Sequence, residues 1–130
     1  MRLNKRRTKL LIVDDEIDLA LTFQKVLQEN GFEVDSLNDP ILALQRFKSH
    51  YYDLLILDIK MPAMNGFELY RNVRKIDDSV KVYFLTALRE LRDYDQYRKE
   101  VSPKLDERYF VSKPIQNEEL IIRVNEMMMA

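Results

Sequence analysis

Acidic residues end two of the aliphatic runs in this sequence. Asp14 and Asp15 close the run KLLIVDD (9–15), and Asp58 closes the run DLLILD (53–58), shortly before a Met-Pro turn at 61–62. One such Asp usually does no more than end a strand, and two before a helix can cap it. Three carboxylates in one cleft would instead repel one another, which raises a pKa or recruits a cation. An all-oxygen site with two or three protein ligands suits Mg²⁺, which a substrate phosphate often completes.

Two further runs end in residues that can handle a phosphoryl group. Thr86 lies near the end of KVYFLTA (81–87), and Lys113 near the end of RYFVSKP (108–114). A carboxylate can attack phosphorus and form an aspartyl phosphate, while the protein positions groups and neutralises charge. Lys113 would supply a point charge and Thr86 a hydroxyl. Taken singly these two residues indicate nothing, so the prediction depends on the whole set.

Composition limits the size and class of the protein. With 130 residues, 46% of them hydrophobic, the chain is long enough for one domain with one core. Lys and Arg number 21 against 22 Asp and Glu, so no overall basic field favours direct nucleic-acid binding. The absence of cysteine excludes disulfides, thiolate metal sites and cysteine nucleophiles.

The ends of the chain and its longest apolar runs bear on location. No apolar run approaches the roughly 20 residues of a membrane-spanning helix, and the start MRLNKRRTK lacks the apolar segment of a secretory signal. We therefore expect a cytoplasmic protein without membrane insertion. We expect residues 1–8 to form a flexible basic tail and residues 9–130 to form the domain.

Short aliphatic runs alternate with longer amphipathic segments along the chain. The third run lacks alternation, which predicts a strand buried on both faces. In the first amphipathic segment we expect Ile17, Leu21, Val26 and Leu27 near one helical face. This alternation predicts an α/β fold whose parallel sheet is covered on both faces. The expected strands are 9–15, 32–37, 53–58, 81–87 and 108–114, and the expected helices are 16–31, 40–50, 66–77 and one that starts at Asn117.

In such a sheet, ligands bind beyond the carboxyl ends of the strands. The polar residues that end the runs should therefore gather at one edge. They are Asp14, Asp15, Asp58, Thr86 and Lys113.

The sequence resembles the receiver domain of two-component response regulators from about residue 9 to residue 128. The pieces that carry the resemblance are IVDDE (12–16), LDIKMPAMNG (57–66), LTA (85–87) and SKP (112–114). The resemblance implies a three-layer, doubly wound α/β fold of the flavodoxin-like kind. Its five-stranded parallel sheet would have the strand order 2-1-3-4-5.

The resemblance also implies a role for each residue of the site. Asp58 would accept the phosphoryl group from a histidine kinase, and Lys113 would bind it, followed by a proline whose preceding bond is commonly cis. Mg²⁺ would be held by Asp14, by Asp15 as the direct ligand, by Asp58 and by the carbonyl of Lys60.

Two residues would transmit the signal by this resemblance. Thr86 would be the switch hydroxyl, and Phe110 the aromatic residue that turns inward on phosphorylation. The face made by the fourth helix, the fifth strand and the fifth helix would then change shape. Residues 88–108 depart from the family's usual pattern, with no Gly and with Pro103, so no dimer geometry is carried over and a homodimer stays open.

Rival functions can be weighed on the same residues. A haloacid-dehalogenase-like phosphatase needs a second Asp two residues after its nucleophile, where this chain has Lys60. A flavin or dinucleotide module needs a phosphate-cradling loop, usually rich in glycine, and the chain has only Gly31 and Gly66. A pseudo-receiver, which binds partners without using the phosphate, remains the alternative.

We therefore predict a signalling switch rather than a metabolic enzyme. Its expected partners are a sensor histidine kinase or phosphotransfer protein, and then a downstream protein or a missing output domain.

Overall fold

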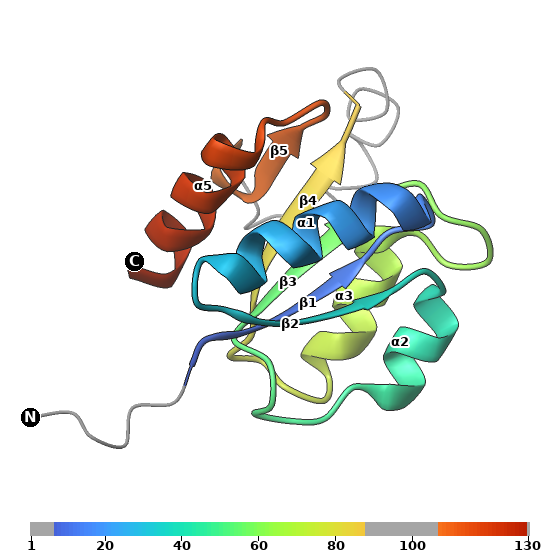
Figure 1. Cartoon of the computed structure of the whole chain (residues 1–130). Helices are drawn as coiled ribbons and strands as arrows, with labels where there is room; N and C mark the ends of the chain where they lie inside the picture. The colour runs from blue at the N-terminus through green and yellow to red at the C-terminus, as the bar shows by residue number, and fades with distance from the viewer. Residues whose placement is uncertain (1–6, 88–106, 130) are drawn as a thin grey trace, which may run out of the picture.

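Five short strands form one parallel sheet in the order β2-β1-β3-β4-β5 (Figure 1). The order and the parallel pairing are those that the sequence and its resemblance predicted. The strands are β1 (Lys9–Val13), β2 (Glu33–Leu37), β3 (Leu54–Asp58), β4 (Lys81–Thr86) and β5 (Phe110–Ser112).

Helices cover both faces of the sheet, so the predicted three layers are confirmed (Figure 1). One face packs against α1 (Ile17–Glu29) and α5 (Asn117–Met129). The other packs against α2 (Pro40–Arg46) and α3 (Gly66–Arg74). A short 3-10 helix, η1 (Glu107–Tyr109), leads into β5.

The computed structural model describes residues 7–87 and 107–129. Most of the predicted basic tail lies outside these ranges, and so does the 88–106 segment, which belongs to the stretch that departs from the family's usual pattern. Within them, no helix combines the length and the apolar character that crossing a lipid bilayer requires.

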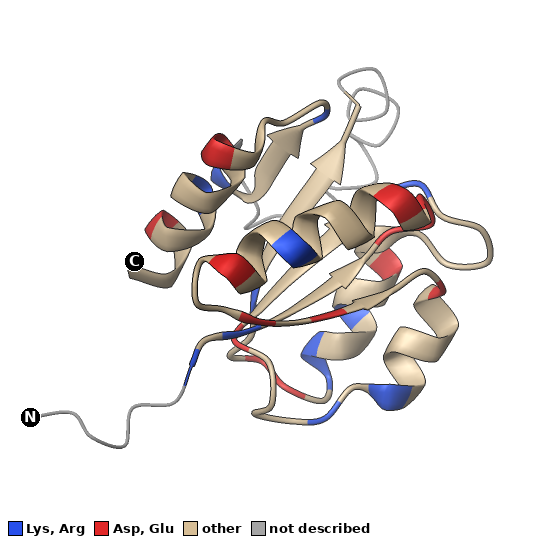
Figure 2. Cartoon of the chain, in the orientation of Figure 1, with Lys and Arg blue, Asp and Glu red and all other residues tan. Residues whose placement is uncertain are grey.

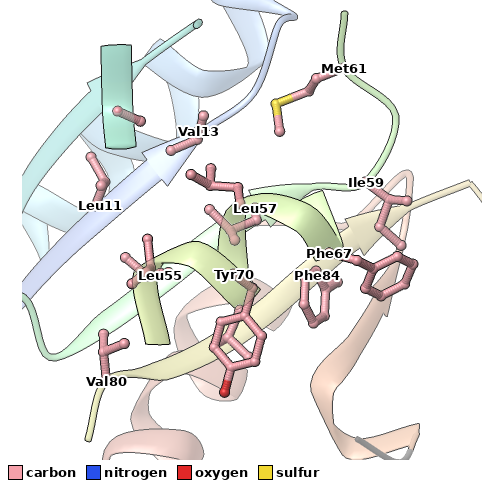
Figure 3. Close-up of a cluster of buried hydrophobic side chains, with 14 of the residues drawn as sticks. Leu11, Val13, Leu55, Leu57, Ile59, Met61, Phe67, Tyr70, Val80 and Phe84 are labelled. Atoms are coloured by element: carbon pink, nitrogen blue, oxygen red, sulfur yellow. The ribbon is translucent and has the colours of Figure 1, made fainter. Parts of the chain in front are cut away.

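The middle strand, β3, contributes residues to the hydrophobic layers on both faces of the sheet. All five residues of β3 are buried, as its unbroken aliphatic run predicted. Leu55 and Leu57 point into the layer under α2 and α3, where Phe67 and Phe84 also pack (Figure 3). β3 pairs with β1 on one side and with β4 on the other, and helices cover both of its faces. The backbone that carries the Asp58 carboxylate is therefore held in place.

The buried face of α1 differs from the expected one. Ala20, Phe23 and Leu27 face the sheet, whereas Ile17 is 51% exposed and Leu21 is 53% exposed. The prediction was therefore wrong for Ile17 and Leu21. Residues three and four positions apart share a helical face, and the set 20, 23 and 27 follows that spacing through a small Ala that the expected stripe left out.

Several elements end earlier than predicted. β1 stops at Val13, two residues before Asp15, although the N–H of Asp14 still donates to the carbonyl of Leu37 at 3.1 Å. The helix expected over 40–50 ends at Arg46, and the one expected over 66–77 ends at Arg74. The strand expected over 108–114 covers only 110–112. Asp14 and Asp15 thus lie beyond the strand, where side chains need not point alternately to the two faces of the sheet.

Candidate functional site

The carboxyl ends of β1, β3, β4 and β5 meet at one edge of the sheet. Parallel pairing sets Asp58 beside Leu85, and Thr86 beside Ser112. The N–H of Lys113 then donates to the carbonyl of Thr86 at 2.8 Å, which carries the pairing one residue further. Acidic segments gather at this edge, beside the first turn of α1 (Figure 2). The structure therefore brings together the residues that end the predicted runs.

Three carboxylates and one ammonium form the centre of the site. Oxygens of Asp14, Asp15 and Asp58 all lie within 4.8 Å of one another. Lys113 Nζ lies 3.1 Å from Asp14 Oδ2 and 3.4 Å from Asp58 Oδ1. Asp14 and Asp58 are buried, whereas Asp15 is exposed. One ammonium against three carboxylates leaves an excess of negative charge.

The turn after Asp58 is folded back onto the strand by its own hydrogen bonds. Asn65 Oδ1 accepts from the N–H of Glu68 at 2.9 Å, and Glu68 Oε1 accepts from the N–H of Asn65 at 3.2 Å, which together cap α3. The N–H of Gly66 donates to the carbonyl of Ile59 at 2.8 Å. A Cβ on Gly66 would lie 2.3 Å from the carbonyl oxygen of Asp58, so only glycine leaves room for that oxygen.

A cavity of about 810 Å³ opens over this centre. Asp58 lines it together with Lys60, the residue predicted to offer its carbonyl to a metal. The Lys113–Pro114 bond beside it is cis, as the resemblance implied. The remaining lining is mixed, with charged Asp15, Glu16 and Lys113 beside apolar Leu19, Phe23, Met61, Pro62, Ala87, Pro114 and Ile115.

Burial changes the titration of the cluster. Burial, with the nearby charge of Asp14, raises the pKa of Asp58 to about 8, although Lys113 acts in the opposite direction. Burial likewise raises the pKa of Asp14 above its usual range. Burial disfavours the charged form of Lys113 too, but attraction to Asp58 and Asp14 outweighs it and raises the lysine pKa. The surroundings of Asp14 and Asp58 therefore stabilise their charged forms less well than water does.

We expect the protein without divalent cations to lose stability as the pH rises from about 4 to 8. In this window the folded state keeps the proton of Asp58, whereas the unfolded chain, with a pKa of 3.8, has released it. Since the folded state binds more protons, the free energy of unfolding falls by up to about 1.4 kcal/mol per pH unit from this group. Urea unfolding in a chelator at several pH values measures the slope.

The variant Asp58→Asn should lose most of this slope, because it cannot titrate. Asp78→Asn is the matched control, since Asp78 is exposed in the loop before β4, at the amino edge of the sheet. Equal slopes in wild type and Asp58→Asn would contradict the prediction.

Thr86 and Phe110, the two predicted switch residues, lie outside the residues that line the cavity. Thr86 is fully buried, and its hydroxyl donates to the carbonyl of Ala87 at 3.0 Å. Phe110 is 9% exposed, and its ring centroid lies 5.4 Å from that of Phe84. The ring predicted to turn inward on phosphorylation is thus already packed inside in this structure, and its switching role stays a prediction.

Sequence reasoning missed two residues of the site. Glu16 contacts Lys113 with its carboxylate, at 3.2 Å. Gly66 allows the close approach of α3 to the backbone of Asp58. In the sequence, Glu16 is only the third acid of IVDDE and Gly66 only the first residue of an expected helix, and neither position indicates these contacts.

The donor set fits a hard divalent cation. Asp14 Oδ2 is buried and accepts no hydrogen bond from the described residues, and its contact with Lys113 Nζ is an ion pair without hydrogen-bond geometry. Such an atom, in a group of three converging carboxylates, is suited to Mg²⁺, which prefers oxygen ligands. An ion there would also offset the cost of burying carboxylate charge, which is the main cause of the raised pKa values of Asp14 and Asp58.

Several proteins of known name or known structure are similar to this chain. The response regulator ArlR of Staphylococcus aureus is 33% identical over 121 residues, which cover 93% of this chain and 52% of the relative. The non-phosphorylated HemR receiver domain of Leptospira biflexa has a TM-score of 0.80 at 23% identity, with 95% of this chain and 96% of that one covered. The BeF3-activated DrrB receiver domain has a TM-score of 0.78 at 21% identity, with coverage of 96% and 100%.

The family model of the response regulator receiver domain matches residues 10–125. That range includes every strand except the first residue of β1, together with every residue of the acidic centre. The chain spans about half the length of the curated relatives that it matches. It belongs to the response regulator receiver domain family of two-component signalling systems.

Proposed function

We propose that Asp58 is the phosphoacceptor of this domain. The observation that carries the proposal is a buried carboxylate that lines an open cavity with an ammonium 3.4 Å from one of its oxygens. The donor would be a phosphohistidine of a sensor histidine kinase or of a phosphotransfer protein. The function is that of a signalling switch, in which the phosphoryl group changes a protein-interaction face.

The transfer is a displacement at phosphorus. An oxygen of Asp58 attacks, a P–O bond forms, and the P–N bond of the donor breaks with its electron pair staying on the imidazole nitrogen. Lys113, already drawn toward Asp58, pairs with the phosphoryl oxygens as charge builds on them. The deprotonated form of Asp58 is the nucleophile, so the raised pKa holds the unliganded site in a less reactive state.

Oxygen ligands for Mg²⁺ come from the same edge of the sheet. We assign the carboxylates of Asp14, Asp15 and Asp58 and the carbonyl of Lys60 to this role, with Asp15 as the exposed carboxylate that a cation meets first. The bound ion would supply positive charge beside the phosphoryl oxygens. Asp14 would exchange its ion pair with Lys113 for the cation, which frees the ammonium for the phosphoryl group.

Thr86 and Phe110 would carry the signal away from Asp58. A phosphoryl oxygen offers the Thr86 hydroxyl a charged acceptor in place of the Ala87 carbonyl. Thr86 ends β4, and Phe84, two residues earlier, stacks on Phe110 of β5. A shift of the end of β4 therefore reaches β5 through packed rings. Output through a protein partner, a further domain or a homodimer is part of this proposal.

Intact mass spectrometry tests the proposal directly. The chain is incubated with a small phosphodonor and Mg²⁺, beside the same mixture with a chelator. One added phosphoryl group that disappears with the chelator would support the proposal. No addition in the complete mixture would instead favour the pseudo-receiver, which binds its partners without phosphate chemistry.

Removing the exposed carboxylate should weaken the metal site. We expect Asp15→Ala to lower Mg²⁺ affinity about tenfold or more, because one charged ligand is lost from a site of few protein ligands. Isothermal titration calorimetry measures the affinity. The control is Asp18→Ala, which removes an exposed acid from the first turn of α1 and should change the affinity far less. Equal losses in both variants would show that Asp15 acts only through net charge.

A further inference from the structure

Lys113 is shared among three carboxylates in the structure. Its Nζ lies 3.1 Å from Asp14, 3.4 Å from Asp58 and 3.2 Å from Glu16 Oε1, and only the last contact is a hydrogen bond between side chains. Asp14 and Asp58 are buried, whereas the side chain of Glu16 is 63% exposed. Glu16 is thus the partner that solvent and an incoming group can reach.

The backbone of Glu16 is fixed by the site itself. Its N–H donates to Asp14 Oδ1 at 2.9 Å, and its carbonyl accepts from the N–H of Ala20 at 3.1 Å in the first turn of α1. The side chain makes no capping hydrogen bond to the helix. Two hydrogen bonds therefore hold the backbone of Glu16, while its carboxylate lines the cavity and contacts Lys113.

A phosphoryl group on Asp58 would need the same ammonium. Lys113 has one positive charge, and a phosphoryl group carries more negative charge than a carboxylate. For Lys113 to pair fully with that group, the Glu16 contact must weaken or break. The contact is partly exposed, so its contribution is that of a surface ion pair, equivalent to about a twofold to fivefold change in affinity.

We propose that Glu16 is a positioning residue that retains Lys113 in the unphosphorylated domain and so lowers the affinity of the site for a phosphoryl group. The inference rests on the proposed role of Asp58 and adds a residue that sets how readily the phosphorylated state forms. Glu16 acts through Lys113, and it does not touch the reacting atoms.

The test measures the affinity for BeF3⁻, a stable mimic of a phosphoryl group on a carboxylate, in saturating Mg²⁺ by amide NMR titration. Glu16→Gln should bind about two to five times more tightly than wild type. Glu29→Gln, which makes the same charge change at the exposed far end of α1, should bind like wild type. The gain should shrink at about 1 M salt, where an exposed ion pair is screened.

A double-mutant cycle shows whether the effect passes through the lysine. In a Lys113→Met background, Glu16→Gln should no longer tighten binding. The role of Glu16 would be overturned if Glu16→Gln tightened BeF3⁻ binding as much in the Lys113→Met background as in wild type. It would also be overturned if Glu16→Gln alone gave no tighter binding while wild type binds BeF3⁻. Either outcome would leave the phosphoacceptor proposal standing. Equal binding by wild type and Asp58→Asn, or none by wild type, would instead overturn the phosphoacceptor proposal, and the role of Glu16 would fall with it.

Discussion

Replacing Asp58 by Asn is expected to abolish phosphorylation of the chain while its fold stays intact. The amide has no carboxylate oxygen to attack phosphorus, so no aspartyl phosphate can form at this position. Asn has nearly the same shape as Asp, which preserves the packing at the end of β3. Intact mass after incubation with a phosphodonor and Mg²⁺ should therefore stay unchanged under conditions in which wild type gains one phosphoryl group.

The charge balance of the site also predicts that this variant folds. Removing one partner of a buried ion pair is costly when it leaves the other charge alone. Here Lys113 keeps Asp14 at 3.1 Å and Glu16 at 3.2 Å, so its ammonium remains paired. The far-ultraviolet circular dichroism spectrum of Asp58→Asn should match that of wild type.

A matched variant separates the loss of the acceptor from the loss of an acid. Asp78→Asn removes an exposed aspartate from the amino edge of the sheet and should be phosphorylated like wild type. A phosphorylated Asp58→Asn protein would show that another carboxylate, with Asp14 and Asp15 the nearest, accepts the group. That outcome would refute the assignment of Asp58.

The sheet and its active edge could be predicted because they follow from repeated, local patterns. Five consecutive aliphatic or acidic residues without alternation, Leu54 to Asp58, predicted a strand buried on both faces, and all five are buried. Parallel strands point their carboxyl ends the same way, so the residues that end them must share an edge. The strand order itself came from the resemblance, since periodicity says nothing about which strands are neighbours.

Helix faces and element ends were less predictable, because they depend on tertiary packing. Ile17 and Leu21 are large and apolar, yet they remain more than half exposed, while the smaller Ala20 faces the sheet. β1 ends at Val13, where the aliphatic residues stop and the acids begin, although the expected strand ran two residues further and included both acids. Asp14 ended up buried and Asp15 exposed, a difference that two adjacent identical residues cannot signal.

The residues missed at the site owe their roles to contacts between distant segments. Glu16 meets Lys113 across 97 positions of sequence, and the pairing follows only once β1 and β5 end at the same edge. Gly66 has no positive φ to announce it, and its importance comes from the space that a side chain would take. Neither contact has a local pattern that a single sequence could reveal.

Gly66→Ala is expected to destabilise the fold strongly, although helix propensity alone predicts the opposite sign. Alanine is favoured over glycine inside helices by about 1 kcal/mol. The new Cβ would lie 2.3 Å from the carbonyl oxygen of Asp58, and 3.1 Å from the Cα of Ile59, so backbone must move. Since backbone at the end of a buried strand yields poorly, we expect a loss of about 3 kcal/mol or more in the free energy of unfolding. Urea unfolding measures it.

The other glycine of the chain provides the control. Gly31 has a φ of +93° and no atom within 4 Å of its would-be Cβ, so Gly31→Ala meets conformational strain of about 1 kcal/mol without a clash. It lies beyond the C-terminal end of α1, at the opposite edge from Asp58, and should leave Mg²⁺ affinity unchanged. Gly66→Ala should lower both stability and Mg²⁺ affinity, because the displaced backbone carries the Asp58 carboxylate with it. Equal effects of the two substitutions on unfolding and on Mg²⁺ binding would show that Gly66 serves the helix and not the site.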